Sequence, residues 1–290
     1  MTDRMDRLAR IDLHAHTNRS DGSLAPAALA RLAADAGLRL LAVTDHDTTD
    51  GFDEAHAAGR SLGLEVVCGT ELTARFPGRA MHLLAYGFER RERGFSEMLA
   101  EIVGGRETRN PKILRLLAEL GRPVTMDEVR AEASGEVIGR PHIARALVRK
   151  GYVPDTKTAF TQLLRDGGPA FVAAESVEPD EVVRTVRDAG GVTVLAHPRQ
   201  LRVESPDALA AVVEELVREG LVGIEVDHPT QQPEERRVLR ALAERLGLVA
   251  SGGSDFHGDA KPHVRIGEGD GTIAVPYETW EALRARCGAR

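Results

Sequence analysis

Seven of the ten histidines in this chain occur in short motifs that could supply ligands to metal ions. In the first motif, Ile11-Asp12-Leu13-His14-Ala15-His16, a strand would send both imidazoles to the same side, because side chains alternate along a strand. Imidazole and carboxylate groups are ligands for zinc, iron and manganese in hydrolytic sites. Further candidates of these two types follow along the sequence: Asp21, His46, Glu71, His82, His142, His197, Asp255 and His257. So many candidates in one chain indicate more than one metal ion.

An alternating series of strands and helices would have to position these side chains. Short apolar runs predict strands near 11–15, 40–44, 65–70, 81–86, 192–196, 222–227 and 248–252. Helical patterns fall near 26–36, 52–61, 179–189, 206–219 and 233–246. Repeated strand–helix–strand units predict a mostly parallel sheet, closed into a TIM-like α/β barrel with one strand fewer than the usual eight. Most candidate ligands follow predicted strands, where α/β barrels carry their active groups.

The alternation stops between about residues 94 and 170, where the pattern becomes helical. Helices are predicted near 95–109, 111–120, 126–133, 141–150 and 156–165. We therefore expect a barrel over residues 8–94 and 171–290, with a helical insertion domain over residues 95–170 between strands four and five. His142 is the one candidate ligand that this insertion supplies.

Composition narrows the class of protein. The net charge of −7 argues against a protein that coats nucleic acid, although metal ions could still hold a nucleotide or a short strand. Cys68 and Cys287 lie far apart and are expected to be free thiols, as in a reducing cytosol. The charged N-terminus lacks an apolar signal core, and no apolar run reaches the roughly 18 residues of a membrane span. A cytoplasmic protein is expected, whose oligomeric state the sequence leaves open.

The motifs and their order resemble those of the polymerase and histidinol phosphatase (PHP) family. His-x-His, Thr-Asp-His-Asp, Gly-Thr-Glu, Ala-His-Pro and Gly-Ser-Asp-Phe-His follow one another as in the family, over about 11–94 and 171–267. The segment Gly139-Arg140-Pro141-His142-Ile143-Ala144-Arg145 resembles the insertion of a subgroup with nucleoside 3′,5′-bisphosphate phosphatases and 5′→3′ exoribonucleases. The resemblance implies a distorted seven-stranded TIM-like (β/α)7 barrel that carries three divalent metal ions. Manganese is expected first, with iron or zinc as alternatives.

The resemblance also implies how the ligands divide among the ions. One ion would take His14, His16, Glu71 and Asp255. A second ion would share Glu71 and take His82 and His142. A third ion would take Asp21, His46, His197 and His257. Each ion would keep room for water or substrate, as a catalytic site requires.

Hydrolysis of phosphate esters fits these residues, with a bisphosphorylated nucleotide or the 5′ end of a short RNA as substrate. Two or three cations can neutralise phosphate oxygens and activate a water as the nucleophile. Asp45 could orient a ligand or relay a proton, and a turn residue is an equally good interpretation. Arg140 and Arg199 each lie two residues from a candidate ligand and could assist catalysis or bind a second phosphate, because a guanidinium donates two parallel hydrogen bonds. His228 could contact the substrate or belong to the rim.

Two other classes of protein compete with this interpretation. A metal-dependent amidohydrolase also uses a His-x-His barrel, but often with a carbamoylated lysine, and no lysine lies at a predicted strand end. Asp21, Glu71 and His82 would be surplus in such a site. A non-catalytic, regulatory metal-binding barrel would have lost ligands, yet each expected position is filled. Metal analysis combined with a phosphatase assay separates the three classes.

Overall fold

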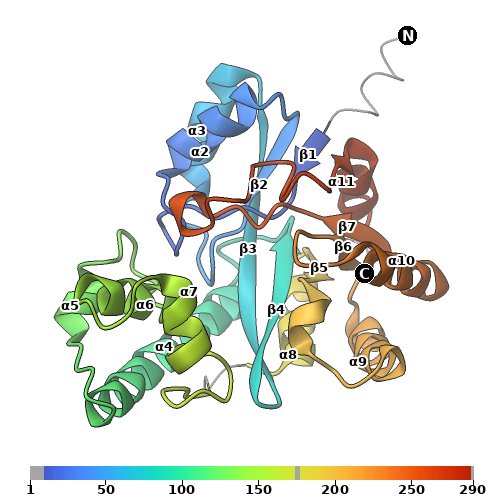
Figure 1. The fold of residues 1–290 in the computed structure, drawn as a ribbon. Helices are drawn as coiled ribbons and strands as arrows, with labels where there is room; N and C mark the ends of the chain where they lie inside the picture. The colour runs from blue at the N-terminus through green and yellow to red at the C-terminus, as the bar shows by residue number, and fades with distance from the viewer. Residues whose placement is uncertain (1–9, 174–176, 289–290) are drawn as a thin grey trace.

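A computed structural model describes residues 10–173 and 177–288, and one eight-stranded sheet forms its centre (Figure 1). The strands are β1 (Arg10–Asp12), β2 (Leu40–Val43), β3 (Glu65–Phe76), β4 (Arg79–Tyr86), β5 (Val192–Leu195), β6 (Gly223–Asp227), β7 (Val249–Gly252) and β8 (Val275–Pro276). They lie in the order β7-β6-β5-β4-β3-β2-β1-β8. The prediction of a barrel-like α/β fold is confirmed, but the predicted count of seven strands is wrong. Strand β8 has only two residues, too few for an apolar period to show.

Strand β4 runs antiparallel to both of its neighbours, β3 and β5, which is a departure from a parallel barrel. Only Pro77 and Gly78 separate β3 from β4, and so short a connection forms a hairpin. The remaining neighbours from β1 to β7 pair in parallel. Because β3 is long, Glu71 lies within this strand rather than after it, and His82 lies within β4.

The two ends of the barrel meet where the first and the last motif lie. Phe256, after β7, pairs with Ala15, after β1, and the amide of His16 donates to the Phe256 carbonyl at 2.9 Å. Gly253 allows this approach, because a Cβ atom there would stand 2.4 Å from the Cβ of His14. The early histidines and the late Asp-x-His motif are therefore neighbours in space.

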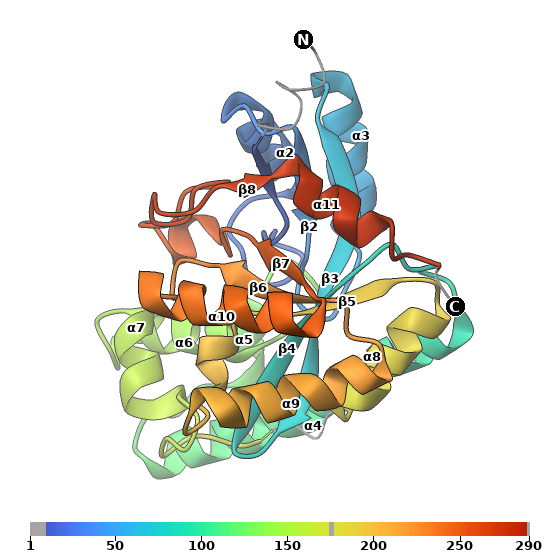
Figure 2. The same ribbon diagram turned by 90° about the vertical axis from the view of Figure 1, so that its right-hand side faces the viewer.

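Helices cover the outside of the sheet, as the apolar periodicity predicts (Figure 2). They are α2 (Pro26–Asp35), α3 (Phe52–Leu62), α8 (Pro179–Asp188), α9 (Pro206–Glu219), α10 (Pro233–Leu246) and α11 (Tyr277–Arg284). Alternation along the strands divides the core into two faces. Leu83 and Leu195 join the cluster of α8 to α10, whereas Leu84 and Val194 face a second cluster with Trp280 of α11.

The segment between β4 and α8 is helical, and its helices stand together beside the barrel (Figure 1). It contains α4 (Arg93–Glu119), α5 (Met126–Arg130), α6 (Arg140–Arg149), α7 (Thr156–Ala159) and a π-helical turn (Phe160–Leu164). The prediction of separate helices at 95–109 and 111–120 is wrong, because α4 runs on through Pro111. Phe95 and Ile102 pack in the barrel core, and Ile113 and Leu117 pack in a separate core of the inserted helices. Burial of both halves offsets the backbone hydrogen bond that proline removes.

The division into a barrel and an insertion domain at residues 95–170 stays a prediction. The predicted boundary at residue 95 falls within α4. This helix contributes side chains to both the barrel core and the core of the inserted helices. The outer bounds, residues 8 and 290, lie outside the described residues.

Candidate metal centre

The predicted metal ligands gather around a cavity of about 950 Å³, lined by the strand ends and by the inserted helices. Four groups have ligand atoms that all lie within 4.8 Å of one another. The groups are His16, Asp21, His46 and His257; His14, His228 and Asp255; His14, Glu71 and His197; and His46, Glu71 and His82. Every predicted ligand except His142 belongs to one of them, and His228 joins them.

Glu71 stands at the centre of these groups. Its Oε1 atom lies 2.8 Å from Nε2 of His197 and 2.9 Å from Nδ1 of His82. Its Oε2 atom lies 3.2 Å from ring nitrogens of each of three histidines: His14, His16 and His46. Different imidazoles therefore face its two oxygens.

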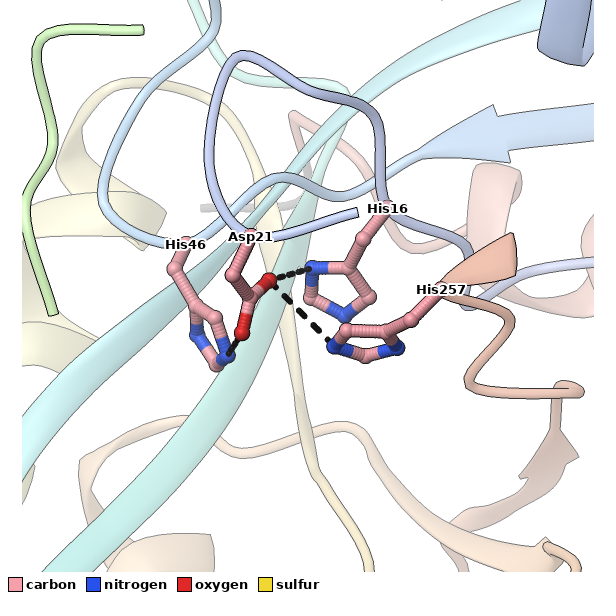
Figure 3. Close-up of side chains that lie close together, drawn as sticks. All are labelled: His16, Asp21, His46 and His257. Carbon is pink, nitrogen blue, oxygen red and sulfur yellow. Dashed lines mark ion pairs between the residues drawn. The ribbon is translucent and has the colours of Figure 1, made fainter. Parts of the chain in front are cut away.

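A second group surrounds Asp21 (Figure 3). The loop after β1 turns this carboxylate back, so that Oδ1 lies 3.3 Å from His257 and 3.7 Å from His16. Oδ2 lies 3.8 Å from Nε2 of His46. This grouping differs from the division that the resemblance implies. His16 has the place that was expected of His197, which instead lies against Glu71.

Glu225 is a site residue that the motifs do not reveal. It is fully buried in β6 and accepts hydrogen bonds from Nδ1 of His14 at 3.0 Å and from the amide of His197 at 2.6 Å. A carboxylate can only accept, so Nδ1 of His14 donates to it, and Nε2 would be the nitrogen that binds a metal ion. The sign of this role in the sequence is one acidic residue inside the apolar run Gly223-Ile224-Glu225-Val226.

Several ring nitrogens near the carboxylates of the described residues lack hydrogen bonds. Nε2 of His14, both nitrogens of His16 and Nδ1 of His46 are buried without a partner among the described residues. Burial by itself would raise the pKa of Glu71, but neighbouring imidazoles, His46 foremost, hold it well below its ordinary value. The pKa of Asp21 is lowered against its burial in the same way. Ionised carboxylates beside unsatisfied imidazoles suit divalent cations.

Two predicted ligands have backbones in the left-handed region. His197 has a φ of 25° and Asp255 a φ of 52°, values that residues with a Cβ atom rarely adopt. Surrounding hydrogen bonds hold both in place. Glu225 binds the amide of His197, and the amide of Asp255 donates to the His14 carbonyl at 2.8 Å. These hydrogen bonds therefore stabilise the unusual backbone conformations of the two residues, whose side chains line the cavity.

His142 is buried in the wall of the cavity, outside the ligand groups. Its Nδ1 accepts a hydrogen bond from the amide of Gly139 at 3.1 Å. Burial and the charge of Arg145 lower the pKa of His142 to about 4, although the charge of Asp21 opposes them, so the ring is neutral. A neutral ring that accepts at Nδ1 carries its proton on Nε2, which cannot then bind a metal ion. The contacts of His142 therefore disfavour its predicted role as a ligand.

Asp45 secures the loop that carries Asp21. It is fully buried, and its carboxylate accepts hydrogen bonds from the amide and the hydroxyl of Thr17, at 2.8 and 2.7 Å. It also accepts from the hydroxyl of Ser20 at 2.6 Å. With both oxygens engaged, Asp45 is suited to positioning rather than to relaying a proton.

The two predicted arginines lie in different surroundings. Arg140 lines the cavity and binds Asp166 at 2.8 Å and the Leu164 carbonyl at 3.1 Å. Arg199 is half-exposed, pairs with Glu235 at 2.7 Å and is not among the residues that line the cavity. The expectation that Arg199 contacts the substrate therefore loses its support.

Other basic residues that the sequence did not single out line the cavity: Arg106, Arg109, Arg145, Lys157 and Lys261. Lys261 comes from the loop after β7 and contacts Oδ2 of Asp255 at 2.6 Å. A lysine thus reaches the centre although none ends a predicted strand. The three arginines come from α4 and α6, so the inserted helices supply most of this positive charge.

The fold and the site define a barrel metallohydrolase, and known proteins resemble the chain over most of its length. The PHP domain model matches residues 12–125. A 5′-3′ exoribonuclease of Haemophilus influenzae is 34% identical, over 86% of this chain and 90% of that protein. A 3′,5′-nucleoside bisphosphate phosphatase of Chromobacterium violaceum is 32% identical, over 96% of this chain and 98% of that protein. The chain belongs to the PHP family.

Solved structures agree with this placement. A metal-dependent phosphoesterase of Bifidobacterium adolescentis superposes with a TM-score of 0.87 at 34% identity, covering 96% of both chains. A Chromobacterium violaceum protein, called an amidohydrolase and solved with bound sulfate, has a TM-score of 0.85 at 31% identity, over 96% of this chain and 97% of that one. The protein is an enzyme, a metal-dependent phosphoesterase.

Proposed function

We propose that the enzyme hydrolyses nucleotide phosphate esters, either nucleoside 3′,5′-bisphosphates or 5′-phosphorylated short RNA. The observation that carries the proposal is that one cavity is lined both by possible metal ligands and by arginines. Buried groups of histidine and carboxylate line one part of it, and arginines of α4 and α6 line another. The names of the two relatives support the same substrate classes.

Three divalent ions would occupy the centre, Mn²⁺ first, with Fe²⁺ or Zn²⁺ as alternatives. The proposed ligands are His14, His16, Asp21, His46, Glu71, His82, His197, Asp255 and His257, and Glu71 would bridge two ions. Bound cations of this kind neutralise phosphate oxygens and lower the pKa of water.

The remaining residues would position and bind. Glu225 holds the ring of His14, and Asp45 holds the loop of Asp21. We assign His142 to the substrate as a hydrogen-bond donor through Nε2, and His228 to the substrate side of Asp255, which lies 3.3 Å away. Arg140 would contact the part of the substrate beyond the scissile phosphate.

A hydrolysis screen of metal-loaded enzyme tests the proposal. It compares nucleoside bisphosphates, 5′-phosphorylated oligoribonucleotides, mononucleotides, histidinol phosphate and simple amides. We expect turnover of the first two classes with Mn²⁺, and its loss on chelation. Preference for histidinol phosphate or for amides would contradict the proposed substrates, and full activity of metal-free enzyme would contradict the metal centre.

Across residues 10–173 and 177–288, no helix is both long and apolar enough to cross a membrane. The cytoplasmic location stays a prediction.

A further inference from the structure

Arg109 of α4 is a buried cation in the wall of the cavity, with no carboxylate bound to it in the described part of the chain. It is 6% exposed. Its Nε and Nη2 atoms donate long hydrogen bonds, of 3.4 and 3.2 Å, to the side-chain oxygen of Asn110. A guanidinium has five donors, so most of its hydrogen-bonding capacity is unused. Burying a charge without a partner of opposite sign costs free energy. A negatively charged ligand bound to Arg109 would reduce this cost.

The two arginines next to it are already paired. Arg106 binds Asp47 at 2.7 Å and Thr73 at 2.9 Å, and Arg140 binds Asp166 at 2.8 Å. Of these three guanidiniums, Arg106 and Arg140 each bind a carboxylate, and Arg109 binds none among the described residues. Burial, followed by the charges of Arg106 and Arg140, lowers the pKa of Arg109 to about 9. The side chain is still protonated at neutral pH.

The start of α6 lies beside this charge. The side chain of Asn110 donates to the Ile138 carbonyl at 2.9 Å, which ties α4 to the chain just before α6. The N-cap residue of α6 is Gly139, whose carbonyl accepts from the amide of His142 at 3.1 Å. Nε2 of His142, in the first turn of α6, is buried without a hydrogen bond among the described residues. An anion here would meet the unused donors of Arg109 and the buried Nε2 of His142.

We propose that Arg109 and Arg140 form a subsite for a second phosphate of the substrate, one that is not cleaved. The inference deepens the proposed function and rests on it. His142 lines the same cavity as Asp21, Arg109 and Arg140, so the subsite and the metal ligands share one space. The phosphate could be the other phosphate of a mononucleotide or an internucleotide phosphate of RNA. Both are oxyanions that match the planar fork of arginine and would supply the missing negative charge.

The test compares Arg109→Gln with Arg115→Gln, an exposed position on the same helix with the same change of charge. The substrates, with Mn²⁺ present, are adenosine 3′,5′-bisphosphate, 5′-phosphorylated triadenylate and 4-nitrophenyl phosphate, which has one phosphate only. For Arg109→Gln we expect kcat/KM to fall about 10- to 100-fold on substrates with a second phosphate and less than about threefold on 4-nitrophenyl phosphate. A loss on the bisphosphate alone, or on the RNA alone, identifies the source of the phosphate. Arg115→Gln should change none of the three.

Thermal unfolding gives a readout that does not depend on turnover. Without ligand, Arg109→Gln should keep or raise Tm, because it removes an uncompensated buried charge. Adenosine 5′-phosphate should raise the Tm of the wild type more than that of the variant. A marked fall in Tm without ligand would overturn the proposal, since it would assign Arg109 to the fold. Equal losses of kcat/KM on all substrates, or no loss, would overturn it too.

The charge-conserving variant Arg109→Lys should lose less activity on the bisphosphate than Arg109→Gln, because it keeps the charge without the fork. If the wild type hydrolyses none of the three substrates, the proposed function fails. The shift in Tm with adenosine 5′-phosphate then still decides whether the subsite exists.

Discussion

Replacing Glu225 by Gln should weaken metal binding while leaving the barrel folded. The carboxylate accepts from Nδ1 of His14 at 3.0 Å and from the amide of His197 at 2.6 Å. The amide of Gln has one accepting oxygen, so its NH₂ group must face one of these two donors. A hydrogen bond to a charged acceptor contributes about 1.5–3 kcal/mol, and losing such an outer partner of a metal ligand costs about 10- to 100-fold in metal affinity.

The measurement is a titration of metal-free protein with Mn²⁺, followed by calorimetry or by competition with a fluorescent chelator. Glu244→Gln is the matched control, because Glu244 is exposed on α10 and outside the ligand groups. The control should bind Mn²⁺ like the wild type. Circular dichroism should show the same secondary structure for all three proteins, since Glu225 is not part of the apolar core.

Two results would refute the reasoning. Wild-type affinity for Mn²⁺ in Glu225→Gln would show that the bonds to His14 and His197 do not position the ligands. If circular dichroism showed that Glu225→Gln is unfolded, Glu225 would be required for the fold rather than for the site.

Three further predictions concern single residues. Glu71→Gln should lose bound metal and activity together while the fold survives, and turnover near that of the wild type would exclude a bridging role. Asp45→Asn should weaken the bonds from Thr17 and Ser20, lowering the free energy of unfolding by about 1–3 kcal/mol in urea titrations, whereas unchanged stability would rule out its role in the loop. Burial raises the pKa of Cys68 to about 12, so its thiol should react with Ellman's reagent only slowly in mildly alkaline buffer until the protein unfolds; fast reaction of the folded protein would contradict this.

The candidate ligands could be read from the sequence because their signals are local. His14 and His16 follow β1, and the ends of other strands supply His46, His197 and Asp255. Nine predicted ligands therefore come together around one cavity, although the motifs span most of the chain. The helices outside the barrel were likewise predictable, because one apolar face repeats with the helical period.

Only the tertiary structure decided how these groups meet. The contacts of Glu71 with His197 and His82 depend on the hairpin that turns β4 antiparallel, and no local pattern records that register. In the sequence, Glu225 is one acidic residue among apolar neighbours. Its contacts with the site form only because β6 pairs with β5.

The inserted helices show the same division between local pattern and packing. Pro111 predicts a break, but burial of both halves of α4 overrides it. Continuous α4 carries Arg109 into the cavity wall beside Arg106 and Arg140, where burial removes it from water and no carboxylate in the described part of the chain binds it. The residue types and their spacing thus determined which chemistry is possible. The packing of distant segments decided which atoms face one another, because burial and distance are properties of the folded chain.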